Sequence, residues 1–82
     1  MRVYLEYHDD DENSHKFWQA DNETTFEDVV WTSWGRIDTN GQKGKPRYFD
    51  TAEAAEGFIT KKTKEKIGKG YVLLEGDFVN NC

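Results

Sequence analysis

Trp34, Gly35 and Arg36 form the segment of this sequence best suited to contact a ligand. They fall in a β-type stretch, where alternate side chains share a face, so Trp34 and Arg36 should lie about 7 Å apart along the chain. An indole ring stacks on sugars or bases, which is worth roughly 1 to 3 kcal/mol, and a guanidinium donates paired hydrogen bonds to phosphate. Gly35 leaves the other face bare and permits close approach of another backbone. The pattern fits a clamp for a nucleotide end, although strand tryptophans more often belong to the core.

The other reactive side chains form no recognisable catalytic or metal-binding motif. The sequence has no nucleophile elbow, phosphate-binding loop or HExxH pair, and its single cysteine, Cys82, has no nearby base. The acidic run His8–Glu12, with His15, lacks the glycine and glutamate spacing of a calcium loop and has no cysteine partners for zinc. We therefore expect a solvated acidic turn, no metal, no cofactor and no enzymatic activity.

Alternation of apolar and polar residues predicts the strands that position Trp34 and Arg36. The expected strands are Arg2–Tyr7, Lys16–Ala20, Phe26–Ile37, Lys45–Phe49 and Tyr71–Leu74. The first two should form a hairpin around the acidic turn, and the third should be central. Asn40-Gly41 is a strong hairpin signal, and Pro46 restricts the following strand to an edge or a strand start. The last strand either closes the sheet or packs under the helix.

One helix is predicted over about Asp50–Ile67. Asp50 and Glu53 have the spacing of a capping box, and lysines gather toward the negative end of the helix dipole. We expect an α+β fold, in which a small antiparallel β-sheet of about four to five strands packs against this α-helix. Residues 1–75 should form the domain and residues 76–82 a loose tail. Trp18 should be core, and much of the core should come from Phe17, Val29, Trp31, Phe49, Ala55, Phe58 and Ile59.

The sequence around Trp34 resembles the WGR domain family, which is named after this tripeptide. Four segments follow the family in order and spacing: SHKFW (14–18), WGRI…GQ (34–42), FDTAEAAEGF (49–58) and EKIGKGY (65–71). The resemblance covers residues 2 to about 74. The family includes domains of DNA-dependent poly(ADP-ribose) polymerases, which dock on a DNA end, and short stand-alone bacterial proteins.

The resemblance implies a non-catalytic module that binds DNA or RNA ends or breaks. In the polymerases the tryptophan packs on the terminal sugar or base and the arginine lies near the backbone. Carried over to this sequence, the nucleic-acid-binding residues are Trp34, Gly35 and Arg36, with Lys16, Lys66 and Tyr71 near the site. Lys43, Lys45 and Arg47 are possible further backbone contacts.

Asp38 departs from the family pattern, which usually has glycine there. Aspartate tolerates left-handed backbone geometry, so the turn is expected to survive. Asp38 is two residues beyond Arg36 and is expected on the same strand face, where its carboxylate would pair with the guanidinium and repel a phosphate.

Charge leaves a second hypothesis open. The net charge is −5, and it divides into −7 over residues 1–40 and +2 over residues 41–82. An acidic chain attracts nucleic acid poorly at long range, so binding would depend on a local cluster of cations. Alternatively, the same surface binds a nucleic-acid-processing protein, since tryptophan and arginine are also favoured at protein interfaces.

The composition also bears on location. The lone Cys82 allows no internal disulfide, and no apolar run suits a signal peptide or a membrane span. We expect a cytoplasmic protein that does not associate with membranes.

Overall fold

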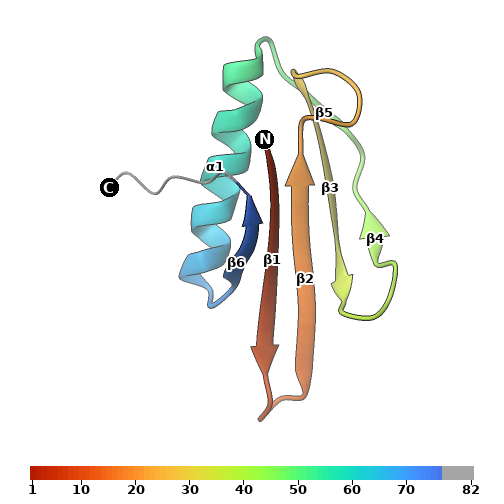
Figure 1. The fold of residues 1–82 in the computed structure, drawn as a ribbon, viewed down its shortest axis with the longest axis vertical. Helices are drawn as coiled ribbons and strands as arrows, with labels where there is room; N and C mark the ends of the chain where they lie inside the picture. Colours follow the sequence, from red (N-terminus) through yellow and green to blue (C-terminus); the bar gives the residue numbers. More distant parts are fainter. Residues whose placement is uncertain (77–82) are drawn as a thin grey trace.

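Six strands and one helix make up the fold, which a computed structural model describes over residues 1–76 (Figure 1). In chain order the elements are β1 (Arg2–Asp9), β2 (Ser14–Asp21), β3 (Val29–Arg36), β4 (Gln42–Lys43), β5 (Arg47–Tyr48), α1 (Ala52–Gly68) and β6 (Val72–Gly76). The strands form one antiparallel sheet in the order β4-β3-β2-β1-β6, and β5 pairs with β3 beyond β4. The fold is the α+β arrangement that the sequence predicts.

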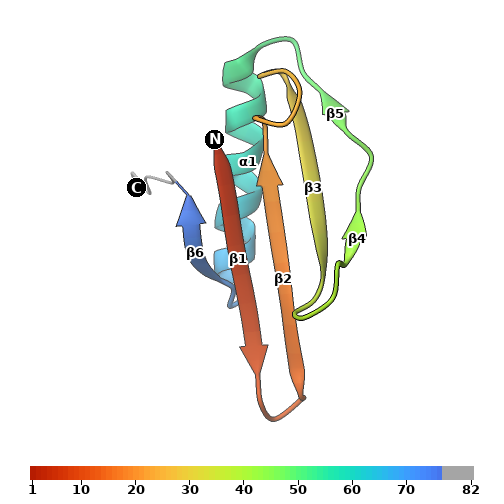
Figure 2. The ribbon, with the colours of Figure 1, turned by 45° about the vertical axis from the view of Figure 1, so that its right-hand side comes forward.

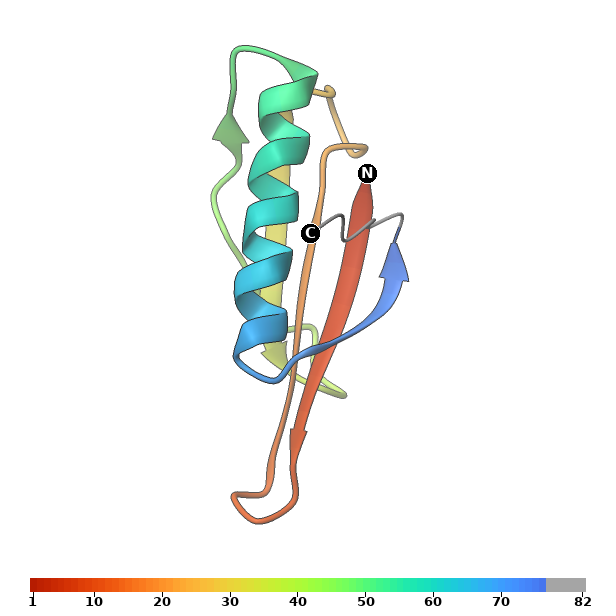
Figure 3. The same cartoon turned by 90° about the vertical axis from the view of Figure 1, so that its left-hand side faces the viewer.

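The helix lies across one face of the sheet and leaves the other face uncovered (Figures 2 and 3). Thr51, not Asp50, caps it, because the Thr51 hydroxyl accepts a hydrogen bond of 3.0 Å from the Ala54 amide. The helix therefore begins two residues later than predicted. At the opposite end of the molecule, the β1–β2 hairpin extends beyond the last turn of α1 (Figure 3).

The strand that follows the Asn40-Gly41 turn differs from the prediction. In place of one strand over 45–49 there are two short ones, β4 and β5, separated by Gly44–Pro46. Pro46 has no amide proton to donate to a ladder, which accounts for the gap. The last strand, β6, closes the sheet by pairing with β1, with a register shift between Tyr4 and Leu5. The predicted tail, from residue 77 on, lies outside the described residues.

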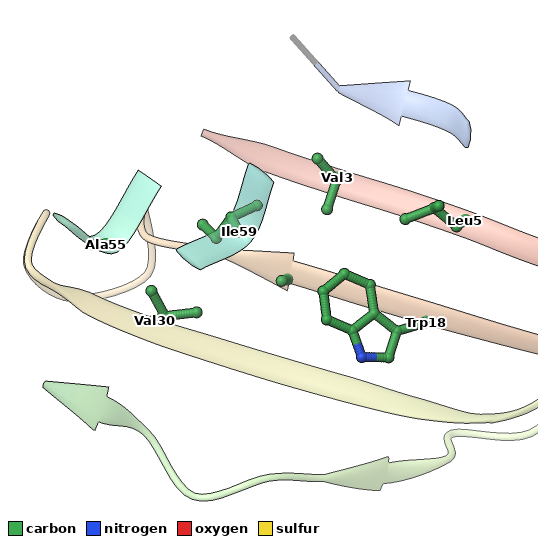
Figure 4. Packing of buried hydrophobic residues seen from close by; sticks show 7 residues of the cluster. Val3, Leu5, Trp18, Val30, Ala55 and Ile59 are labelled. Carbon is green, nitrogen blue, oxygen red and sulfur yellow. The ribbon is translucent and has the colours of Figure 1, made fainter. Parts of the chain in front are cut away.

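The core fills the space between the sheet and α1 (Figure 4). The antiparallel register places Leu5 opposite Trp18 and Val3 opposite Ala20, so these side chains share the helix-covered face. The buried cluster consists of Val3, Leu5, Trp18, Ala20, Val30, Ala55 and Ile59, none more than 7% exposed.

Trp31 is not a core residue, contrary to prediction. Val30 points toward α1, so alternation along β3 turns Trp31 to the uncovered face, where it is half-buried. Phe49 and Phe58 are also only half-buried, and their rings lie 5.4 Å apart at the edge of the core. The other predicted core residues, including Phe17, are buried. Phe17 lies on the uncovered face, where it stacks against Tyr4 with ring centroids 6.0 Å apart.

Candidate nucleic-acid interface

The candidate site lies on the helix-covered face, near the C-terminal end of α1. The register of β2 and β3 pairs Lys16 with Arg36 and Trp18 with Trp34. Directly paired residues project from the same face with Cβ atoms about 5 Å apart. Two cations and two tryptophans thus form a compact square. The expected placement of Trp34 and Arg36 on one face agrees with this register.

The helix and the turn into β6 add a cation and an aromatic ring to this square. The Lys66 ammonium lies 5.8 Å from the centre of the Trp18 ring and 5.2 Å from that of Tyr71. The turn is held by the Tyr71 amide, which donates to the Lys66 carbonyl at 3.0 Å. Residues from two distant segments therefore meet on one surface. Lys16, Trp34, Arg36, Lys66 and Tyr71 are called the candidate interface below.

Tyr7 also lies on this surface, a placement that was not predicted from the sequence. Its ring lies 5.4 Å from that of Tyr71, and the Lys16 ammonium lies 5.1 Å from its centre. The alternation of Val3, Leu5 and Tyr7 was the available signal, since it places Tyr7 on the helix-covered face. Alternation does not give the length of the hairpin relative to the helix. It therefore could not predict whether α1 covers that part of β1.

The surface is positively charged and partly shielded from water. Burial lowers the pKa of Lys66, and the nearby Lys69, Lys16 and Lys62 lower it further, while Glu65 acts in the opposite direction. Burial also raises the pKa of Tyr71. Lysines that repel one another gain from an added anion, because its charge stabilises their protonated form. Within residues 1–76, Lys16, Arg36 and Lys66 form no direct ion pair with a carboxylate.

Trp34 and Trp18 lie side by side but differ in exposure. Trp18 is 7% exposed and belongs to the core, whereas Trp34 is 39% exposed. The Trp34 ring is close to Gly44, where an added Cβ would come within 3.0 Å of its Cζ3 atom. The neighbouring backbone thus supports one part of the ring, and much of the rest is open to solvent. Such a ring can stack with little loss of side-chain entropy.

Gly35 has a structural role beneath the site. An added Cβ at Gly35 would lie 2.6 Å from the Cα of Gly41. Gly41 has φ +67° and itself sits against the carbonyl of Trp34, where a Cβ would approach to 2.4 Å. The expected close approach of a backbone is therefore made by the chain itself. Glycine at 35 and 41 lets the turn after β3 fold against the strand that carries Trp34 and Arg36.

Asp38 does not share a face with Arg36, so that expectation was wrong. The strand ends at Arg36, and Asp38 takes φ +77° in the turn that follows. It lines a hollow on the uncovered face together with Tyr4 and Phe17. There it is one of the carboxylates that, after the Glu6 hydrogen bond and burial, raise the pKa of Tyr4 to about 12. Alternation stops where the strand stops, and the expected left-handed geometry is what turns Asp38 away.

The three further basic residues are not gathered at this surface. Lys43 is paired with Ser33 and lines a pocket on the uncovered face. Arg47 pairs with Val30, six residues along β3 from Arg36, and lies 4.9 Å over the Phe58 ring. Lys45 is exposed between β4 and β5. The structure therefore separates Lys43 and Arg47 from the candidate interface, whereas Lys45 directly follows Gly44, which lies against the Trp34 ring.

The acidic hairpin tip is held by local hydrogen bonds. The Asp9 carboxylate accepts from the amides of Asp11 and Glu12, at 3.1 and 3.3 Å. His8 and His15 face each other across the hairpin, with their Nδ1 atoms 2.8 Å apart. In the part of the chain that the structure describes, no group of three or more His, Cys, Asp or Glu side chains is placed to hold a metal ion.

The fold and this surface define a small binding module, with a helix-backed sheet that presents an exposed tryptophan among cations. Comparison with protein-family models identifies the family of this module. The WGR domain model matches residues 1–77, and the chain belongs to this family. WGR domains are known as nucleic-acid-binding modules rather than catalytic domains. Comparisons with curated proteins and with solved structures gave no significant match. Within residues 1–76, the helix is neither long nor apolar enough to span a bilayer.

Proposed function

We propose that this domain binds nucleic-acid ends, those of DNA above all, through the candidate interface. The observation that supports this most is the register of β2 and β3, which sets Lys16 beside Arg36 and leaves Trp34 exposed next to them. Lys66 reaches the same surface from α1. A local cluster of three cations provides the phosphate affinity that the acidic chain as a whole lacks.

Each side chain of the candidate interface has a separate role in this proposal, set by its chemistry. The Trp34 ring packs on the terminal sugar or base, where no further base pair competes for the stacking surface. Arg36 donates paired hydrogen bonds to the phosphate at the end, while Lys16 and Lys66 neutralise the charge of neighbouring phosphates. Tyr71 positions Lys66 through the turn that links α1 to β6. The domain binds without turnover in this proposal, as its family does.

Titration of a labelled, 5′-phosphorylated duplex at two salt concentrations tests the proposal. Arg36→Ala should weaken binding by about 1.5 to 3 kcal/mol, the usual value of a hydrogen bond to a charged group. It should also reduce the slope of log affinity against log salt concentration by the contribution of about one phosphate contact. Arg47→Ala is the matched control, because Arg47 lies in β5 over the Phe58 ring and pairs with Val30, six residues from Arg36 along β3. Absence of binding by both the wild type and Asp38→Gly would rule out the proposal.

The charge distribution favours a second candidate, a protein-interaction module. Residues 1–40 carry a net charge of −7, and the exposed acidic tip of the β1–β2 hairpin extends beyond α1. A nucleic-acid-processing protein with a basic surface would fit this acidic region while the Trp34 surface provides the contact area. In that case Arg36→Ala abolishes binding of the protein partner, and duplex affinity stays undetectable in every variant.

A further inference from the structure

The face of the sheet that α1 leaves uncovered holds a separate pocket. Its volume is about 260 Å³, and β1 to β4 all contribute to its lining. The side chains that matter below are Arg2, Gln19, Asp21, Trp31, Ser33 and Lys43. This volume is close to the lower end of the roughly 300 to 1,000 Å³ that is usual for small-molecule sites. It therefore suits one small molecule rather than a peptide or a strand.

The strand registers arrange these side chains in two neighbouring rows. One row runs across three strands from Arg2 through Asp21 to Trp31. The next row runs from Gln19 through Ser33 to Lys43. Rows two residues apart are about 7 Å from each other, so the rings and charges of both rows border one hollow. Lys43 lies at one corner and Arg2 at the opposite corner, with the indole between them.

Hydrogen bonds hold the polar groups of this pocket in place. The Gln19 side-chain amide donates to the Ser33 hydroxyl at 2.7 Å, and the Trp31 ring nitrogen donates to the Thr25 hydroxyl at 3.1 Å. Asp21 accepts from the Thr24 amide and hydroxyl through Oδ1, whereas its Oδ2 atom takes part in neither bond. A ring that is already oriented loses little entropy when a ligand stacks on it.

We propose that this pocket binds a nucleoside monophosphate. Its base stacks on Trp31 and its phosphate pairs with Lys43, which is exposed and forms no ion pair within residues 1–76. Arg2 and Asp21, which lie in the same row as Trp31, offer a donor and an acceptor to the edge of the base. Gln19 and Ser33 lie between the two ends, within reach of the ribose. The site is on the opposite face from Trp34, so it does not depend on the proposed function.

Adenosine monophosphate is the probe, and the three tryptophan indole N–H resonances are the readout. AMP at millimolar concentration should shift the Trp31 resonance and leave that of Trp34 in place. Removing the phosphate charge or its partner should weaken binding roughly tenfold, as is usual for a charge-assisted contact. Adenosine and the Lys43→Gln variant should both show this loss. Lys45→Gln is the matched control, since Lys45 is two residues away and does not line the pocket.

Trp31→Ala should abolish the binding of AMP, and the surface change Lys43→Gln keeps the test valid if that variant does not fold. The proposal is overturned if AMP leaves the Trp31 resonance unchanged, or if adenosine binds as tightly as AMP. Equal losses in Lys43→Gln and Lys45→Gln overturn it as well. A short single-stranded oligonucleotide distinguishes the source of the nucleotide: a Trp31 shift with the oligonucleotide alone, and none with AMP, contradicts a site for free nucleotides.

Discussion

The two faces of the sheet use similar residue types for different surroundings. Trp31 and Trp34 are three residues apart in β3, so they project from opposite faces. Around Trp34 the charged neighbours from β2, β3 and α1 are cations, whereas the pocket beside Trp31 contains both cations and Asp21. A polyanionic backbone needs cations that carboxylates have not neutralised. A small ligand with donors, acceptors and one phosphate suits the mixed environment.

The largest effect is expected at Gly35, which lies in β3 between Trp34 and Arg36. Gly35→Ala places a Cβ 2.6 Å from the Gly41 Cα, so backbone must move. We expect a loss of about 2 to 4 kcal/mol in the free energy of unfolding, as for other changes that force overpacking and strain. Chemical denaturation measures it. Gly57→Ala, with no atom within 4 Å of the new Cβ and a helical position, should instead stabilise by about 0.5 to 1 kcal/mol. Equal stability of both variants would contradict the packing of Gly35 on Gly41.

The next effect separates the two tryptophans directly. Trp34→Ala should weaken binding of a phosphorylated duplex by about 1 to 3 kcal/mol with little change in salt dependence, because stacking releases no counterions. Trp31→Ala should leave duplex affinity within about 0.5 kcal/mol of the wild type, since its ring lies on the other face. Fluorescence anisotropy of the labelled duplex measures both. The division of roles between the faces fails if the two variants lose the same affinity.

A smaller effect is expected at Asp38. Because the Asp38 carboxylate faces Tyr4 rather than Arg36, Asp38→Gly removes no ion pair from the guanidinium. Glycine adopts the observed φ of +77° without strain, so the variant should be more stable by at most about 1 kcal/mol. Duplex affinity should rise only by the long-range loss of one negative charge, and more at low salt than at high salt. An increase that persists at high salt would place the carboxylate at the candidate interface after all.

The smallest effect concerns the titration of Tyr4 on the uncovered face. The hydrogen bond to Glu6, with burial and nearby carboxylates, raises the pKa of Tyr4 from 10.0 to about 12. The stabilisation that belongs to the neutral phenol is complete below pH 10 and is lost as the pH rises through about 12. Ultraviolet absorbance should show a late phenolate step in the wild type. Tyr4→Phe should remove that step and Tyr48→Phe should keep it, and the assignment fails if the reverse is observed.

Most of the fold followed from local patterns. Alternation located the strands that pair in the sheet, and helical spacing with lysines near one end located α1 to within two residues at its start. The errors came where a pattern ended. The capping residue is Thr51 rather than Asp50, because the Thr51 hydroxyl accepts the hydrogen bond from the Ala54 amide in the first turn of the helix. The strand expected over 45–49 is interrupted at Pro46, because proline has no amide proton to donate to the ladder.

The sequence by itself determined that Trp34 and Arg36 share a face, since a period of two within one strand fixes side-chain direction without reference to any neighbour. Only the tertiary structure decided what stands beside them. The β2–β3 register brings Lys16 to Arg36, and the packing of α1 brings Lys66 over Trp18. Because α1 packs on the face that carries Trp34, Trp31 and Lys43 are left on the uncovered face. Register and helix position depend on contacts between segments far apart in the chain, and periodicity within a segment carries no information about them.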